Sequence, residues 1–353
     1  MPAGAIALLL FSLVLSPQQS RGYWSSAPSM LAPGTGQVVV HLTDGRVMVI
    51  GGEDVTDGFP VPTTQLYTPT LRQWAYGPDL TTGRIGATAT TLQDGRVLVV
   101  GGLDPKLDPL RSAEIFNPSA GRWTTTTPLP QTRFAQSATL LNDGRVLLVG
   151  GIVAGRISTS GLFFSPDTNK WLPAPATQYA HAQQSALVLK DGNVLIAGGY
   201  GEPEIYRPAQ NGWTLAKITA FRSHPVVVEL HDGSVLMASG RGAHERDLRT
   251  SRLFSPATGA WTPAGSLHAT RSQAIGTLLP NGEVLVAGGE QVTVHVLRSA
   301  ELYDPQTHAW TATAPMRTPR DAAIAFSPGD ETVMVCGGMN LSGVLSTCEQ
   351  YHP

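Results

Sequence analysis

The chain has 353 residues and a formal net charge of -2, and only 14% of its residues are Asp, Glu, Lys or Arg. That charged share lies well below the roughly 25% of an average soluble domain. A nucleic-acid partner would need a concentrated positive field, and the sequence has no basic run, so the composition argues against nucleic-acid binding. The length is large for one globular core but suits a repeat architecture, whose core is divided among units.

The first residues form an apolar leader. Residues 3–16 read AGAIALLLFSLVLS, a charge-free run of signal-peptide length that is too short for a comfortable membrane span. Small residues at Ser20 and Gly22 fit cleavage after Gly22. The start lacks Lys and Arg, so a lipid-facing anchor or a misassigned start stays open. We expect residues 1–22 to be a signal peptide and the mature chain to be secreted, periplasmic or on the cell surface, without an integral membrane span.

From there on, one short pattern recurs about every fifty residues. An apolar strand, an Asp-Gly or Asn-Gly pair and a second apolar strand predict a tight hairpin, because the turn residues tolerate positive φ. Val97–Val100 is one such buried strand. A glycine pair ends the hairpin, beginning at Gly51, Gly101, Gly150, Gly198, Gly288 and Gly337, with a degenerate Ser239-Gly240 in the remaining copy.

Each copy continues with an aromatic-x-Pro element, which closes a third strand because Pro cannot donate to a sheet ladder. Its aromatic residues are Tyr67, Phe116, Phe164, Tyr206, Phe254, Tyr303 and Tyr351. A tryptophan follows on a predicted fourth, outer strand, at Trp74, Trp123, Trp171, Trp213, Trp261 and Trp310. A four-stranded sheet cannot bury its own faces, so the copies are expected to stack around a ring.

The last aromatic-x-Pro element ends at Pro353 and has no tryptophan after it, whereas Trp24 stands about one repeat before Trp74. We infer that the segment around Trp24 supplies the outer strand of the C-terminal unit and closes the ring. The sequence therefore predicts one all-β domain over residues 23–353, with seven blades of four antiparallel strands.

A period of about fifty with Gly-Gly and a later Trp resembles the kelch-repeat β-propeller superfamily, from about Tyr23 to the C-terminus. The resemblance implies a galactose oxidase/kelch-type central domain. It also implies that the loops before the first strand and after the second strand lie on one face of the ring. That face carries the variable segments, at residues 53–64, 103–110, 152–160, 241–250, 290–298 and 339–346.

The two cysteines fall on neighbouring strands of the predicted last blade. Cys336 precedes the last Gly-Gly and Cys348 precedes the last aromatic-x-Pro element. A disulfide between them would staple the ring-closing blade and would require an oxidising compartment. Two buried free thiols are the alternative.

A series of cations recurs on the variable face, where each blade's first strand begins. Kelch adaptor proteins that capture acidic peptides line their pocket with similar arginines, so the resemblance implies ligand binding. A structural role is the alternative, with the arginines bonded to loop carbonyls or to the series Glu114, Glu204, Glu301 and Glu349. The candidate ligand-binding residues are Arg84, Arg133, His181, Arg222, Arg271 and Arg320, joined by Arg241 and His244 in the charged loop after Ser239-Gly240.

Catalytic motifs are not evident in the sequence. The nine histidines show no metal-ligand spacing, there is no Gly-x-Ser-x-Gly element, and the glycine pairs end hairpins. We expect no cofactor, no bound metal and a monomer that binds a protein or carbohydrate ligand without catalysis. The resemblance leaves a carbohydrate-active enzyme open, either a sugar epimerase or mutarotase or an oxidase-like protein. The oxidase is disfavoured because it needs two Tyr and two His copper ligands and a cysteine cross-linked to tyrosine. A subunit of a larger surface assembly is a third possibility.

Overall fold

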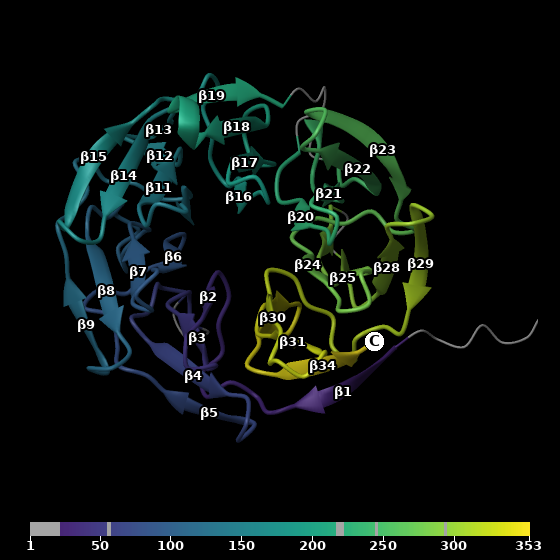
Figure 1. Ribbon diagram of the computed structural model, residues 1–353. Coiled ribbons are helices and arrows are strands. Elements are labelled where there is room, and N and C mark those ends of the chain that lie inside the picture. Colours follow the sequence, from purple (N-terminus) through teal and green to yellow (C-terminus); the bar gives the residue numbers. More distant parts are fainter. Residues whose placement is uncertain (1–21, 55–57, 217–221, 244–245, 293–294) are drawn as a thin grey trace, which may run out of the picture.

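The computed structural model of the protein describes residues 22–54, 58–216, 222–243, 246–292 and 295–353. Within them, seven four-stranded antiparallel sheets stand as blades around a central axis. The first strand of each blade lies nearest the centre and the fourth lies at the rim (Figure 1). The predicted all-β, seven-bladed propeller is confirmed.

The first three blades follow the chain without interruption. Blade 1 contains β2(Val38–His41), β3(Val47–Ile50), β4(Thr64–Thr68) and β5(Gln73–Tyr76). Blade 2 contains β6(Thr88–Thr91), β7(Val97–Val100), β8(Ala113–Asn117) and β9(Arg122–Thr125). Blade 3 contains β10(Ser137–Leu140), β11(Val146–Val149), β14(Gly161–Ser165) and β15(Lys170–Ala174).

The next three blades repeat the arrangement. Blade 4 contains β16(Ser185–Val188), β17(Val194–Ala197), β18(Glu204–Arg207) and β19(Gly212–Leu215), with the short 3-10 helix η1(Pro208–Gln210) before its last strand. Blade 5 contains β20(Val226–Glu229), β21(Val235–Ala238), β22(Thr250–Ser255) and β23(Ala260–Ser266). Blade 6 contains β24(Ile275–Leu278), β25(Val284–Ala287), β28(Ala300–Asp304) and β29(Ala309–Thr313).

Blade 7 joins the two ends of the chain. It contains β30(Ile324–Phe326), β31(Val333–Cys336) and β34(Cys348–His352), and its outer strand is β1(Tyr23–Ala27). Trp24 pairs with Tyr351 across β1 and β34, and its indole Nε1 donates to the carbonyl of Ala314 at 2.8 Å. The predicted closure by the segment around Trp24 is confirmed.

The cysteines of blade 7 form the expected disulfide. Cys336 and Cys348 lie opposite one another on β31 and β34, and their sulfur atoms are 2.03 Å apart. Both residues are buried. The bond therefore links the second and third strands of the blade whose third strand also holds β1.

The glycine pairs allow neighbouring blades to approach closely. Gly101 adopts a φ of +63°. A Cβ at this position would lie only 2.3 Å from the carbonyl oxygen of Arg133 in the next blade. Gly102 donates its backbone N–H to the same carbonyl at 2.9 Å. In blade 5 the first glycine is replaced by Ser239, which adopts a positive φ of 58° that L residues rarely occupy.

The hydrophobic core lies between the blades. The four residues of β7 are all buried, and Met48 and Ile50 of blade 1 pack in one cluster with Val97 and Val99 of blade 2. The rim tryptophans connect blades as well. Trp123 packs on Phe116 with 5.2 Å between ring centroids and donates its indole N–H to the carbonyl of Pro78, in the segment leading from blade 1. Each blade therefore depends on its neighbours for burial.

Three small hairpins rise from the loops that follow the Gly-Gly pairs. They are β12(Ile152–Val153) with β13(Arg156–Ile157), β26(Glu290–Gln291) with β27(His295–Val296), and β32(Met339–Asn340) with β33(Gly343–Val344). We call the side of the ring that carries these loops the Gly-Gly face. The opposite side, with the Asp-Gly turns, is the Asp-Gly face.

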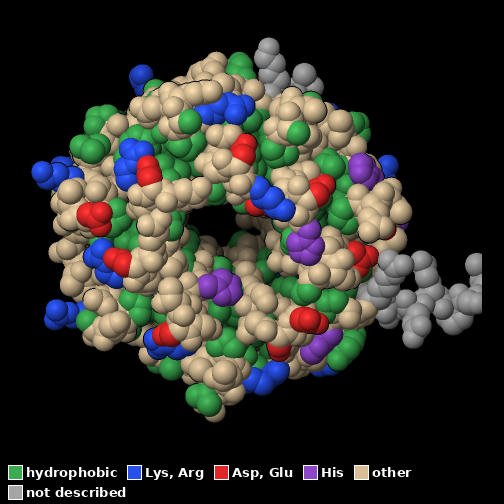
Figure 2. Space-filling view, viewed as in Figure 1, with side chains coloured by type: hydrophobic (Ala, Val, Ile, Leu, Met, Phe, Trp, Pro, Cys, Tyr) green, Lys and Arg blue, Asp and Glu red, His purple; other side chains and the backbone are tan. Residues whose placement is uncertain are grey.

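Figure 2 shows that the ring surrounds an opening at its centre, with acidic and basic side chains next to one another at several places around it. Exposed ion pairs of the Asp-Gly turns include Arg46 with Asp44 at 2.7 Å and Arg145 with Asp143 at 2.6 Å. Among the residues described, there is no helix with the length and apolar character that crossing a bilayer requires.

Candidate functional site

The predicted cation series occupies equivalent positions in six blades, immediately before the first strand. The side chains of Arg84, Arg133, His181, Arg222, Arg271 and Arg320 are between 0% and 3% exposed. Their guanidinium and imidazole groups therefore lie inside the blades, beneath the Gly-Gly face.

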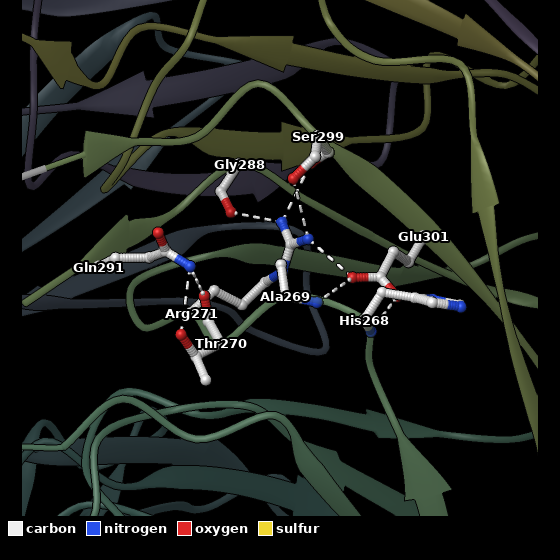
Figure 3. Close-up of polar contacts among 8 residues, drawn as sticks. All are labelled: His268, Ala269, Thr270, Arg271, Gly288, Gln291, Ser299 and Glu301. Carbon is white, nitrogen blue, oxygen red and sulfur yellow. Dashed lines mark hydrogen bonds and ion pairs between the residues drawn. The ribbon is translucent and has the colours of Figure 1, made fainter.

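Arg271 illustrates the arrangement (Figure 3). Its Nη1 donates to the carbonyl oxygens of Gly288 at 2.8 Å and Ser299 at 3.0 Å. Its Nη2 donates to Oγ of Ser299 at 3.1 Å and to Oε1 of Glu301 at 2.9 Å. One side chain thus joins the end of the second strand to the beginning of the third.

The same bonds recur around the ring. In blades 2, 3, 5, 6 and 7, Nη1 of the arginine donates to the carbonyl of the first residue of the Gly-Gly pair or its Ser239 replacement. These acceptors are Gly101, Gly150, Ser239, Gly288 and Gly337. In blade 4, Nε2 of His181 lies 3.0 Å from Oε1 of Glu204 instead.

The glutamates of the third strands are the second part of this framework. Oε2 of Glu301 accepts the backbone N–H of His268 at 2.7 Å, while Oε1 accepts from Arg271. Burial acts to raise the pKa of Glu301, but the bonds from His268 and the charge of Arg271 hold it below its usual value. Glu114 binds Thr81 and Glu349 binds Arg317 and Thr318 in the same way.

Three blades lack this carboxylate. Gln65, Leu162 and Arg252 stand on β4, β14 and β22 where the other four blades have Glu. Burial lowers the pKa of Arg133 to about 10. Burial and then the charge of Arg252 lower that of Arg222 to about 10. Carbonyl and hydroxyl oxygens hold these two arginines, those of Gly150 and Ser160 for Arg133 and those of Ser239 and Thr250 for Arg222.

Each cation of the series therefore has hydrogen-bond partners inside its own blade. Such contacts are those expected if the cations have a structural role. A ligand would have to displace those partners to reach the guanidinium groups. The ligand-binding role of the six residues stays a prediction.

Arg241 differs from them because it lies at the surface of the Gly-Gly face. Its side chain is 23% exposed and forms ion pairs with Asp247 at 3.0 Å and Glu290 at 2.7 Å. Its Nη2 also donates to Oγ of Ser272 in the next blade at 3.1 Å. His244, predicted beside it, lies outside the described residues.

A second set of residues forms a ring around the opening on this face. In every blade the residue after the cation position forms a β-bridge with the residue after the Gly-Gly position. The seven pairs, here called the collar, are Thr35–Glu53, Ile85–Leu103, Phe134–Ile152, Ala182–Tyr200, Ser223–Arg241, Ser272–Glu290 and Asp321–Met339.

Backbone hydrogen bonds tie neighbouring blades together beside the collar. Ala135 donates to the carbonyl of Gly86, and Gln183 donates to that of Ala135. Since these residues lead directly into the innermost strands, the collar surrounds the central opening. Its side chains vary from blade to blade although its backbone geometry repeats.

The collar has two chemically different arcs. Blades 2 and 3 contribute Ile85, Leu103, Phe134 and Ile152, all of them partly exposed. Blades 5 to 7 contribute two serines, Arg241, the carboxylates of Glu290 and Asp321, and Met339. Such a surface can receive a ligand with an apolar part and a polar or charged part.

Asp321 is the most perturbed member of the polar arc. The residue is 6% exposed, and its Oδ1 has no hydrogen-bond partner within the described part of the chain. Burial, and then the negative charge of Glu290, raise the pKa of Asp321 to about 6. Glu290 itself accepts bonds on Oε1 from Arg241 and Gln273, each at 2.7 Å.

The sequence did not single out Glu290 and Asp321. Glu290 directly follows a glycine pair and Asp321 directly follows Arg320 of the cation series. Comparing these positions across the repeats could therefore have found them. The burial of Asp321 and its electrostatic interaction with Glu290 of the neighbouring blade have no signal in the sequence. Among the described residues, no three His, Cys, Asp or Glu side chains converge as a metal-ligand group.

Comparison with protein families found the kelch motif at residues 86–130 and 275–317. Comparison with curated proteins found no significant match. Among solved structures, the chain is similar to a fungal alcohol oxidase with catalytic diversity among the AA5 family, in complex with copper. The TM-score is 0.75 at 18% identity, and the match covers 95% of this chain and 76% of the oxidase chain.

At that identity the likeness shows the fold alone. The kelch matches fall on blade 2 and blade 6, in phase with the Gly-Gly and aromatic-x-Pro elements that repeat through all seven blades. Together with the ring of four-stranded sheets, they identify the chain as a kelch-repeat β-propeller.

Proposed function

We propose that the protein is a non-catalytic binding module that presents the collar and the variable loops of the Gly-Gly face to a protein or carbohydrate ligand. The observation that carries this proposal is a difference between adjacent positions of the repeat. The repeated Arg and Glu side chains are buried and bonded within their blades, whereas the collar residue next to each cation position ranges from Ile85 and Phe134 to Ser272 and Asp321.

Binding arrays of glycans and peptides test this function. A ligand detected with the wild type should be lost in Phe134→Ala or Glu290→Gln, which change the two arcs of the collar. A matched control is Arg96→Ala on the Asp-Gly face, where the exposed Arg96 pairs with Asp94. Binding that survives both collar changes, or that is lost equally in the control, would contradict the proposal.

The disulfide supports a location outside a reducing cytoplasm. We place the mature protein, residues 23–353, in a secreted, periplasmic or surface location as a monomeric domain, after removal of residues 1–22. N-terminal sequencing of the exported protein and its mass in solution would test this. A mature chain that retains residue 1 would overturn the cleavage.

A sugar epimerase or mutarotase is a second candidate, favoured by one observation. Asp321 combines burial with a pKa near neutrality, which suits a group that accepts and returns a proton. Proton NMR of freshly dissolved pure sugar anomers would show faster equilibration with the wild type than with Asp321→Asn. Equal rates for the two proteins and for buffer would remove this candidate.

The oxidase alternative fits the residues less well. The cysteine cross-link that such an oxidase needs requires a cysteine outside a disulfide, and both cysteines are joined to one another. No step is therefore assigned to copper.

A further inference from the structure

Glu290 and Asp321 come from neighbouring blades whose segments are joined beside the collar. Ala322 donates its backbone N–H to the carbonyl of Gln273 at 3.2 Å, and the amide of Gln273 donates to Oε1 of Glu290 at 2.7 Å. Glu290 begins β26 and forms a bridge with Ser272, whereas Asp321 forms two backbone hydrogen bonds with Met339 at the start of β32. After burial, the negative charge of Glu290 is the second cause of the raised pKa of Asp321. The pair therefore lies at the foot of two hairpins, β26–β27 and β32–β33.

Among the collar residues of this arc, carboxylates outnumber guanidinium groups. Its one guanidinium, on Arg241, is already paired with two carboxylates, those of Asp247 and Glu290. Asp321 adds a third carboxylate. The amide of Gln273 and the guanidinium of Arg241 both donate to Oε1 of Glu290, and neither reaches Asp321 in a described bond.

A buried carboxylate oxygen without a donor is unfavourable, since nothing replaces the water it gave up on folding. Oδ1 of Asp321 is such an atom within the described residues. A ligand with a positive charge and N–H donors would balance the negative charge and also supply the hydrogen bond that Oδ1 of Asp321 lacks. An alkylammonium group has three N–H donors and a compact charge, so it can serve two carboxylates together.

The walls beside the pair are apolar and exposed. Val292, at the tip of the β26–β27 hairpin, is 52% exposed. On the β32–β33 hairpin, Met339 is 42% exposed and Leu341 is 80% exposed. Both hairpins are anchored at their bases, because Gln291 donates to the carbonyl of Thr270 and Asn340 donates to that of Pro319. The apolar side chains are thus presented on fixed supports.

We propose that Glu290 and Asp321 bind the ammonium group of a lysine side chain in a protein partner, while apolar residues next to that lysine pack on Val292, Met339 and Leu341. This inference rests on the proposed binding function and names its ligand chemistry. The methylene stem of lysine can lie against apolar side chains while its ammonium group meets the carboxylates. The ligand is opposite in charge to the acidic peptides that the arginine series would attract.

The test uses the mature protein on a solid support and a nonapeptide library with a fixed central lysine and random flanks. The same library with acetyl-lysine at the centre has no ammonium charge and serves as the matched probe. We expect the wild type to retain the lysine library at least about tenfold better, the size of one charged hydrogen bond. The retained flanks should be rich in aliphatic and aromatic residues.

Asp321→Asn and Glu290→Gln should each abolish that preference for lysine over acetyl-lysine. Leu341→Ser should keep it but remove the preference for apolar flanks. The control is Asp94→Asn, which neutralises an exposed carboxylate on the opposite, Asp-Gly face and should bind as the wild type does. No preference of the wild type for lysine, or an equal loss in Asp94→Asn, would overturn the inference.

An amino sugar offers the same ammonium chemistry. Glucosamine that binds to the wild type and not to Asp321→Asn, in the absence of any lysine-peptide preference, would overturn the protein partner in favour of a sugar. If the lysine library fails while a different ligand from the arrays depends on the collar, the binding function stands and only this inference falls.

Discussion

Nη2 of Arg271 and Oε1 of Glu301 lie 2.9 Å apart inside blade 6, where neither side chain is more than 3% exposed. The pair holds the Gly-Gly end of β25 next to the start of β28, and Glu301 extends the link to the backbone of His268 and Ala269. The arginine series resembles a ligand pocket in sequence. In the structure, its contacts hold the strand ends beneath the loops of the Gly-Gly face.

Arg271→Ala should destabilise the protein by about 3–5 kcal/mol, because it leaves Glu301 buried without its cation. The free energy of unfolding in urea measures this. Arg96→Ala should change it by less than about 1 kcal/mol, since that ion pair is exposed. A stable Arg271→Ala protein that has lost ligand binding would instead assign the arginine to the ligand.

Arg133→Ala should be milder than Arg271→Ala. Arg133 has no carboxylate partner, so its removal leaves no buried charge unpaired. It takes one donor each from the carbonyls of Gly150 and Ser160 and from the Ser160 hydroxyl. We expect a loss of about 1–3 kcal/mol in the same urea measurement. Equal losses in the two variants would show that the buried carboxylate is not what makes Arg271 costly to remove.

Reduction of the disulfide should lower the free energy of unfolding by about 2–3 kcal/mol, because the bond closes a short loop between β31 and β34. Thermal melts with and without a reductant provide the measurement. The double variant Cys336→Ala, Cys348→Ala should melt at one temperature in both conditions. An unchanged wild-type melt on full reduction would refute this prediction.

Deletion of residues 1–30 should destabilise all seven blades and not only the last. Without β1, Tyr351 and the rest of β34 lose their outer neighbour and the ring opens. Thermal unfolding should shift to a much lower temperature and lose cooperativity. Trp24→Phe, which keeps β1 but loses the bond to Ala314, should cause only a small shift.

Asp321 should make stability depend on pH in one direction. Its folded pKa of about 6 lies above its ordinary value of 3.8, because of burial and then Glu290. Well below about pH 4, Asp321 is protonated in the folded and in the unfolded state, so it does not change the free energy of unfolding. Between about pH 4 and 6 the unfolded state ionises first, so stability falls as pH rises, by at most about 3 kcal/mol.

Asp321→Asn should therefore match the wild type near pH 4 and be more stable at pH 7.5, although it should lose the lysine-binding preference. Urea unfolding at the two pH values measures the difference. A variant that is less stable at pH 7.5 would show that the ionised carboxylate has a stabilising partner.

The fold was largely predictable, because its signals are local and repeated. Asp94-Gly95, Gly101 and Phe116 each mark one turn or strand end, and seven copies in phase define the blades. The closure could be inferred from Trp24 and the disulfide from the register of two strands.

The site was less predictable, because it depends on the direction in which each side chain points. Arg84 and Ile85 are adjacent in the chain, yet the first points into the blade toward Gly101 and the second belongs to the collar. The effect of the Glu290 charge on Asp321 acts between two blades and has no counterpart in the pattern of either repeat. Residue type alone drew attention to the arginine series and missed the carboxylates of Glu290 and Asp321.

Blade 7 also has a consequence for how the chain reaches its native state. The other six blades are built from strands that follow one another, whereas Ser25 and His352, which bond across β1 and β34, are 327 residues apart. Closing so long a loop has a higher entropic barrier than forming any hairpin, and it delays folding. We expect the six contiguous blades to form first and the pairing of β1 with β34 to be the slow final step. Until that step, the exposed edge of β34 could accept β1 from a second copy, so refolding at high concentration should yield exchanged dimers.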